Sequence, residues 1–205
     1  MMPIFHHTKT HGRFFFIHIP RTAGRFLIDN FWLNDYDIEH HLTNERIKTP
    51  VYSYLWAPVE GVEISHTHYS LYNKWKGIKD LPSITVVRNP IDRFFSASGR
   101  LASGLQSSFE NWTKYKNFFS KKKISNWWRP QHEFVSPHTN IWKYEDGFGK
   151  NFCDWINNIL PINFSIKTDV YEKGNYDHAP GLLKTPKLMD NIKKFYHRDF
   201  EKFDY

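Results

Sequence analysis

The chain has 205 residues, enough for one compact domain with its own hydrophobic core. Lys and Arg total 28 against 21 Asp and Glu, and this net charge of +7 favours an anionic partner: a nucleotide, a nucleic acid, an acidic glycan or a membrane surface. Cys153 is the single cysteine, which excludes an internal disulfide, and no stretch approaches the ~18 apolar residues of a membrane span.

Apolar runs and helical patterns predict the secondary structure. In chain order they predict a strand over 13–19, a helix over 24–34, strands over 62–66 and 83–88, helices over 90–101 and 109–119, a strand over 140–145, a helix over 148–160 and a last helix from about Thr185 and Pro186. Asn89 suits the N-cap of the helix that begins at Pro90.

Strands that alternate with helices indicate an α/β fold with a largely parallel sheet. No repeat or biased linker marks a boundary, so we expect a single domain over residues 1–205. Ligands of such sheets bind beyond the carboxyl ends of the strands. The residues that follow each predicted strand are therefore the candidates for a site.

The first strand is followed by "IPRTAGR", a loop that leads into a helix. Backbone N–H groups at such a junction can converge on one anion, and the helix dipole adds positive potential. Ala23 and Gly24 would let a phosphate approach, Thr22 would offer a hydroxyl, and Arg21 and Arg25 would supply cationic donors. The spacing GxxxxGK[ST] is absent, and a tight turn with surface arginines explains the same residues.

The strand at 83–88 is followed by "RNPIDRFFSAS". Arg88 ends the strand, and Ser96 lies two helical turns beyond Pro90 on the face that also carries Arg93. Arg88 and Ser96 could together bind a second phosphate. For Arg93 we expect a structural role in an ion pair.

The strand at 62–66 is followed by "SHTHYS". If the strand persists, His66 and His68 point to one face of the sheet, where either could act as a base. The pair could instead hold a metal, although no third ligand sits at a suitable spacing. Four other histidines are expected at the surface: His6, His7, His40 and His41.

Together these motifs resemble the nucleotide-dependent sulfotransferases, in particular the carbohydrate branch of the heparan-sulfate 2-O-sulfotransferase type. The family's 5′-phosphosulfate loop "hIPKTAGTS" reads "IHIPRTAGRF" here, and its 3′-phosphate motif "RDPxxRxxSxY" reads "RNPIDRFFSAS". The family's "HGHVSF" is similar to "SHTHYSLY", and "IWKYED" and "FYHRDFEKFDY" resemble a later strand and the closing helix. The likeness spans nearly the whole chain and is weakest over 35–60 and 102–130.

The resemblance implies a P-loop-like three-layer sandwich, with a central, mostly parallel sheet flanked by helices. It implies an O-sulfotransferase that moves a sulfonyl group from 3′-phosphoadenosine 5′-phosphosulfate (PAPS) to a hydroxyl of a carbohydrate or similar acceptor. No metal is expected, because fixed cations would neutralise the phosphates.

The resemblance also implies the role of each site residue. His68 would be the general base, with His66 in support, and Arg21 would stabilise the charge that develops during transfer. Lys184 would contact the donor from a covering loop. The donor-binding residues would be Pro20, Arg21, Thr22, Ala23, Gly24, Arg25, Phe26, Arg88 and Ser96.

Two residues depart from the family pattern. Arg21 replaces a lysine, and a planar guanidinium is not equivalent to an ammonium point charge. Arg25 replaces a small hydroxyl residue. An alternative is therefore a catalytically impaired module of the same fold that binds a nucleotide or an anionic glycan.

The acceptor is expected to be a hydroxylated molecule such as a glycan. Its wall could include Trp127, Trp128, Arg129 and His132, although the tryptophans could equally belong to the core. The charge and the "WWR" sequence also suit single-stranded nucleic acid, but no nucleic-acid motif is present and we expect no such partner.

The start "MMPIFHHTKTHGR" lacks the apolar region of a secretory signal. A single cysteine favours a reducing compartment. Animal members of the family are usually anchored in the Golgi by an N-terminal span. The expectation is therefore a cytoplasmic, microbial or viral form, or a Golgi-lumen domain whose anchor has been removed.

Overall fold

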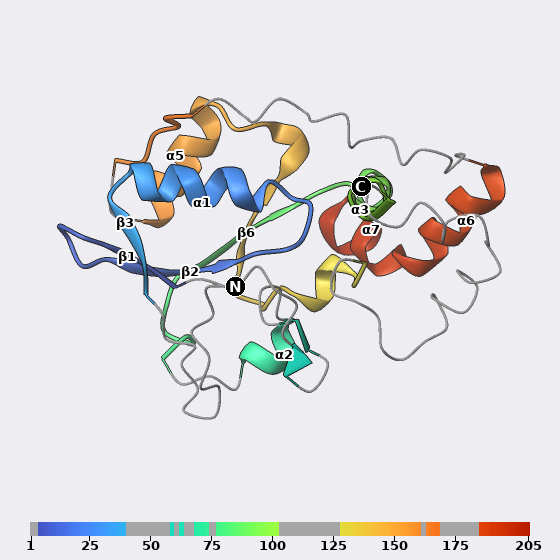
Figure 1. The fold of residues 1–205 in the computed structure, drawn as a ribbon, viewed down its shortest axis with the longest axis horizontal. Helices are drawn as coiled ribbons and strands as arrows, with labels where there is room; N and C mark the ends of the chain where they lie inside the picture. Colours follow the sequence, from blue (N-terminus) through green and yellow to red (C-terminus); the bar gives the residue numbers. More distant parts are fainter. Residues whose placement is uncertain are drawn as a thin grey trace.

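The computed structural model describes residues 4–39, 58–59, 62–63, 68–73, 77–102, 128–160, 163–168 and 185–205. These residues form an α/β fold around a five-stranded mixed sheet with the strand order β3-β1-β2-β6-β7 (Figure 1). Its strands are β1 (Ile4–His7), β2 (Arg13–Ile17), β3 (Tyr36–Glu39), β6 (Ser83–Val87) and β7 (Asn140–Lys143). The predicted α/β class is confirmed.

The helices match most of the helical predictions. They are α1 (Gly24–Leu33), α2 (Tyr69–Tyr72), α3 (Pro90–Ala102), α5 (Lys150–Ile159), α6 (Pro186–Phe195) and α7 (His197–Phe203), with 3₁₀ turns η2 (Gln131–Glu133) and η3 (Tyr144–Asp146). The last predicted helix is two helices that meet at Tyr196. The helix predicted over 109–119 lies outside the described residues.

The sheet is mixed rather than mostly parallel as predicted. β2, β6 and β7 run parallel to one another, but β1 is antiparallel to both of its neighbours, β2 and β3. A tight hairpin joins β1 to β2, with the His7 N–H bonded to the Gly12 carbonyl at 2.8 Å, and a hairpin makes the two strands antiparallel. His6 and His7 lie on β1 and are partly exposed, and His40 and His41 lie outside the described residues.

The strand predicted over 62–66 does not belong to this sheet. β5 (Val62–Glu63) pairs with β4 (Pro58–Val59) in a separate two-stranded sheet. Residues 64–67, which include His66, lie outside the described part of the chain. The histidine pair therefore does not follow a strand of the central sheet.

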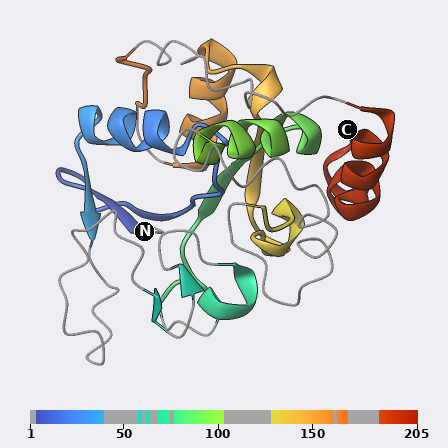
Figure 2. The ribbon, with the colours of Figure 1, turned by 45° about the vertical axis from the view of Figure 1, so that its right-hand side comes forward.

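Hydrophobic clusters cover both faces of the central sheet. Alternate residues of β2 point to opposite faces: Phe14 and Phe16 pack with α1 and α5, whereas Phe15 and Ile17 pack with α2, α7 and the segment around Phe134. Figure 1 shows α1 and α5 on one side of the sheet and α2 on the other. Figure 2 shows α6 and α7 together at one end of the molecule, where α6 packs on α3.

Two buried asparagines fix α1 to the segment 163–168. The Asn30 side-chain oxygen accepts from the Lys167 N–H at 2.8 Å, and its amide nitrogen donates to Thr168 Oγ1 at 2.8 Å. One turn later, Asn34 bonds the N–H and the carbonyl of Ser165. Because Ser165 lies beside Asn34 and Thr168 beside Asn30, the segment runs along α1 towards its N-terminus.

Replacing Asn30 with Ala should destabilise the fold. The substitution leaves the Lys167 N–H without its buried acceptor, and such a loss costs about 2 kcal/mol in the free energy of unfolding. Urea unfolding measures the loss. Lys9→Ala is the control, because its ion pair with Asp35 is exposed and little loss is expected. Equal losses for both variants would contradict this account.

Candidate functional site

The β2–α1 loop (residues 18–23) has an unusual backbone. Arg21 and Ala23 adopt positive φ angles of 69° and 67°, a region that non-glycine residues seldom occupy. The buried Thr22 hydroxyl donates to the Ile19 carbonyl at 2.8 Å and so closes the turn from within. That hydroxyl is therefore used by the loop itself, whereas the sequence suggested a donor to an anion.

The N-terminus of α1 begins without a protein cap. Its N-cap is Ala23, which makes no side-chain cap hydrogen bond, and its first turn holds no acidic residue. The first amides of a helix have no partner within the helix, so here they can bind an anion. Arg25 is exposed on this turn, whereas the Phe26 side chain belongs to the core and only its N–H can contribute.

The N-terminus of α3 differs, because protein groups satisfy it. Asn89 Oδ1 accepts from the Ile91 N–H at 3.0 Å, which confirms the predicted N-cap. The Asn89 N–H donates to Glu145 at 2.7 Å, and Asp92 lies in the first turn. The start of α3 is therefore less open to an anion than that of α1, and an anion near α3 would depend more on side-chain donors.

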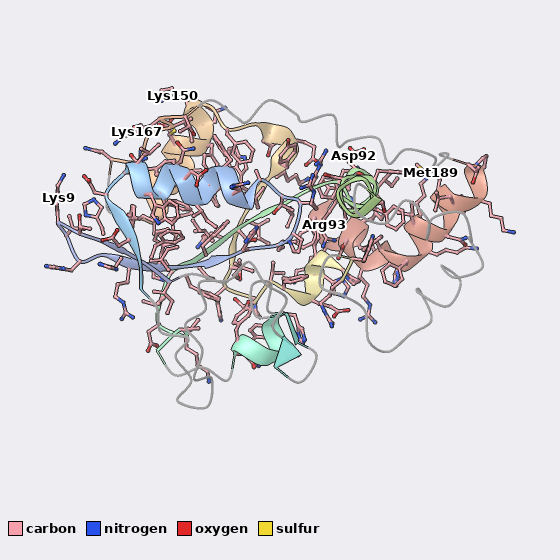
Figure 3. The ribbon with its side chains drawn as sticks, viewed as in Figure 1. Lys9, Asp92, Arg93, Lys150, Lys167 and Met189 are labelled. Carbon is pink, nitrogen blue, oxygen red and sulfur yellow. The ribbon has the colours of Figure 1, made fainter. Side chains whose placement is uncertain are left out.

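Two side chains of α3 join it to the β2–α1 loop. Arg21 Nε donates to Ser96 Oγ at 3.0 Å, and Arg93 Nε donates to the Pro20 carbonyl at 3.0 Å. Arg93 is only 1 % exposed, and Figure 3 shows it on the side of α3 that faces α7, whereas Asp92 lies on another side of the helix. Burial lowers the pKa of Arg93, and Tyr196 and Asp199 oppose that shift. Its expected structural role is supported by these bonds to backbone carbonyls.

A second segment, residues 128–135, is fixed to the same guanidinium; we call it the bridging segment. Arg93 donates through a terminal nitrogen to the Arg129 carbonyl at 3.0 Å, and the Tyr196 hydroxyl donates to the Trp128 carbonyl at 2.6 Å. The fully buried Asp199 accepts from the N–H groups of Gln131 and His132 at 2.7 and 2.8 Å. The loop and the bridging segment are thus held at one end of the sheet.

Arg88 lies at the end of β6 beside this assembly. The Gln131 side chain bonds both the N–H and the carbonyl of Arg88, at 2.9 and 2.7 Å. The Arg88 guanidinium lies 4.6 Å from the centre of the Tyr144 ring. Tyr144 packs on Phe148, and Phe148 packs on Phe26, so a row of rings leads from Arg88 to the first turn of α1.

The C-terminal residue packs at the same edge. The Tyr205 hydroxyl donates to Glu145 at 2.8 Å, while Lys143 donates to the Asp204 carbonyl at 2.8 Å. Burial raises the pKa of Tyr205, and its bond to Glu145 adds to the effect. Tyr205 therefore stays a neutral donor beside Arg88 over the physiological range of pH.

His68 occupies the start of α2. Its carbonyl accepts from the Tyr72 N–H, and the Tyr72 hydroxyl donates to the Phe134 carbonyl at 2.7 Å, so α2 is fixed to the bridging segment. His68 Nδ1 lies 2.8 Å from Ser70 Oγ. If Nδ1 carries the proton and donates to Ser70, the other nitrogen, Nε2, keeps its lone pair and can act as a base.

The surroundings of His68 favour its neutral form. Burial lowers the pKa of the imidazole, and the charge of Arg129 lowers it further, whereas Glu133 raises it. Arg129 and Glu133 form an ion pair with each other. His68 is therefore a neutral imidazole at neutral pH, beside a cation and a carboxylate of the bridging segment.

The structure brings together several of the sequence-predicted residues. Arg21 contacts Ser96 directly, and Arg93 of the same helix contacts Pro20. The loop then continues through Ala23 into α1, which begins at Gly24. His66, Lys184 and Trp127 lie outside the described residues. Two candidates for the acceptor wall have structural partners instead: Trp128 packs against the α3–α6 cluster, and His132 bonds Asp199.

Sequence reasoning missed four residues that shape this site: His18, Ser70, Gln131 and Asp199. Asp199 did leave a signal, because it shares a helical face with Tyr196 and Phe203, and a charge on an apolar face indicates a buried polar bond. Gln131 bonds Arg88, 43 residues earlier, which no local spacing indicates, whereas Ser70 lies only two residues after His68. His18 acts on Gly24, six residues later, across the loop.

The described residues contain no group of three or more His, Cys, Asp and Glu arranged to hold a metal ion. None of the helices that the structure describes combines the length and apolar character needed to cross a membrane. Comparisons with protein-family models, with curated proteins and with solved structures each find no match to this chain. Any function assigned to the chain therefore depends on the geometry of these residues.

The charges of the bridging segment should move the pKa of His68 in opposite directions. Arg129→Gln should raise the pKa of His68, because a nearby cation is lost, and Glu133→Gln should lower it. NMR titration of the His68 ring measures both shifts against the unchanged chain. Shifts of the same sign, or none, would show that the bridging segment does not lie beside the imidazole.

Proposed function

We propose that this chain is a PAPS-dependent O-sulfotransferase with a carbohydrate or similar hydroxylated acceptor. The observation that carries the proposal is the contact between Arg21 and Ser96. It places the uncapped N-terminus of α1 next to α3, so that two candidate phosphate sites lie at one edge of the sheet. A nucleotide with phosphates at both ends of its ribose suits that arrangement.

The proposal includes a P-loop-like arrangement in three layers. Its support is the parallel set β2, β6 and β7, and the hydrophobic clusters on both faces of the sheet. The first strand of that set enters the uncapped helix α1. The antiparallel β1 and β3 would be additions at the edge of this parallel set.

The donor would be held by two groups of residues. The amides at Gly24, Arg25 and Phe26, with Arg21, would face the 5′-phosphosulfate. Arg88 and Ser96 would bind the 3′-phosphate, since Pro90 has no N–H and Asn89 already caps the Ile91 N–H at the start of α3. The donor supplies an activated sulfonyl group, and the chain supplies cations and amides that stabilise the charge of the departing phosphate.

His68 would act as the general base of the transfer. The acceptor oxygen bonds to sulfur as the bond from sulfur to the 5′-phosphate oxygen breaks, and 3′-phosphoadenosine 5′-phosphate leaves. His68 Nε2 takes the proton of the attacking hydroxyl, provided that Nδ1–H donates to Ser70 Oγ. Its lowered pKa keeps the imidazole in the basic form at neutral pH.

One observation favours a second candidate function. The Arg21 side chain bonds Ser96, on the side of the proposed 3′-phosphate site. A lysine in its place would present a point charge to the departing phosphate, whereas the guanidinium of Arg21 is engaged across the loop. The alternative is a module that binds the nucleotide or an anionic glycan without transferring the sulfonyl group.

Removing the imidazole should abolish transfer while leaving nucleotide binding intact. His68→Ala should lower the transfer rate by about 10²- to 10⁴-fold, the usual contribution of a general base. The measurement uses radiolabelled PAPS and a panel of glycans. In the unchanged chain the rate should fall as the pH drops through the lowered pKa of His68, because protonation removes the base.

Calorimetry with 3′-phosphoadenosine 5′-phosphate separates the two candidate functions. Tight binding without any transfer would support the binding module. A wild-type chain that neither binds this nucleotide nor transfers label would contradict both.

Arg88 should discriminate between nucleotides by their 3′-phosphate. Arg88→Ala should weaken binding of 3′-phosphoadenosine 5′-phosphate by roughly ten- to a hundredfold, as expected for loss of a charged hydrogen bond. Binding of adenosine 5′-phosphate, which lacks the 3′-phosphate, should change little. Arg198→Ala on the exposed face of α7 removes the same charge and controls for general electrostatics. An equal loss for both nucleotides would exclude Arg88 from the 3′-phosphate site.

A further inference from the structure

The imidazole of His18 occupies the place where a side chain at Gly24 would lie. A Cβ built on Gly24 would be 1.9 Å from His18 Nε2 and 2.1 Å from Cδ2. Carbon atoms do not approach this closely, so any larger residue at position 24 must displace the ring. Gly24 is itself buried.

A second contact, with Phe16, also holds the ring of His18 in place. His18 follows directly after β2, and its ring stacks on Phe16 with the centres 5.9 Å apart and the planes 15° from parallel. Phe16 is a core residue of the sheet. The contact with Gly24 therefore links the start of α1 to the end of β2 through two rings.

Gly24 is the first residue of α1, and its N–H belongs to the group that the helix leaves without a partner. Moving a Cβ from 1.9 Å to an ordinary contact distance of 3.4 Å requires a displacement of about 1.5 Å between ring and helix. Misplacement on this scale strongly weakens a set of donors aimed at one anion.

The loop before Gly24 stores backbone strain. Arg21 and Ala23 have positive φ angles, and such residues persist only where the surroundings hold them. Pro20 is held by Arg93, Arg21 by Ser96, and Thr22 by its bond to Ile19. The end of the loop, at Gly24, is fixed by the contact of Gly24 with the His18 ring.

We propose that His18 is a positioning residue of the anion site, and that it sets the first amides of α1 by packing against Gly24. The sequence suggested that this glycine lets a phosphate approach. In the structure the imidazole of His18 fills the space beside the Gly24 Cα. A glycine is therefore required here by the packing of the loop rather than by the approach of a ligand. The ligand part of this inference rests on the proposed function.

A double-mutant cycle tests the packing. Gly24→Ala should lower the melting temperature by about 5 °C, and the same change in a His18→Ala background should lower it far less, because the ring is gone. Gly149→Ala is the matched control: a Cβ there meets nothing within 4 Å, and little change is expected. Additive effects of Gly24→Ala and His18→Ala would overturn the proposal.

Binding of 3′-phosphoadenosine 5′-phosphate by the same four proteins tests the positioning role. Gly24→Ala should weaken binding at least about tenfold, His18→Ala should weaken it as well because the ring that positions the amides is lost, and the double variant should bind no more weakly than the weaker single variant. Full binding by His18→Ala would overturn the positioning role, and so would a double variant whose loss is the product of the two single losses, because Gly24 would then act on the ligand independently of His18. If the unchanged chain binds no nucleotide, the proposed function fails, and the melting temperatures alone decide the packing.

Discussion

The arrangement of this end of the molecule depends on one buried cation. The guanidinium of Arg93, inaccessible to solvent, donates to the carbonyl of Pro20 on the β2–α1 loop and to that of Arg129 on the bridging segment. A buried charge without hydrogen bonds is costly, so the fold is stable only when both segments lie against it. The loop, α3 and the bridging segment are therefore fixed together, and the candidate site is the edge that they share.

That constraint explains how groups far apart in the sequence come to act together. The Tyr72 hydroxyl bonds the Phe134 carbonyl and so fixes α2 to the bridging segment. As a result, the Arg129–Glu133 pair of that segment lies near His68 at the start of α2. Asp199 and Tyr196 hold the segment from behind. Arg21 and the N-terminus of α1 lie beside α3, and Arg88 lies at the end of the neighbouring strand β6, while α3 is capped by its own asparagine. We propose that His68 belongs to the same site.

Local pattern predicted the parallel core of the fold well. β2, β6 and β7 and helices α1, α3 and α5 follow from apolar periodicity, and the Asn89 cap follows from helix-end chemistry. β1 and β3 were missed, because "IFHH" and "YDIE" are short and partly polar, and their stability comes from pairing in the sheet rather than from local propensity. The sequence also led us to expect the loop after β2 and the start of α3 to lie close together, and the bond from Arg21 to Ser96 agrees with this. The packing of His18 on Gly24 and the bonds of Asp199 depend on tertiary contacts that no short sequence window contains.

The most direct measurement is a crystal structure of the chain with 3′-phosphoadenosine 5′-phosphate bound. The account predicts the 5′-phosphate on the first amides of α1 and the 3′-phosphate between Arg88 and Ser96, with Nε2 of His68 facing the vacant sulfonyl position. A nucleotide bound elsewhere, or an imidazole turned away from the 5′-phosphate, would contradict it.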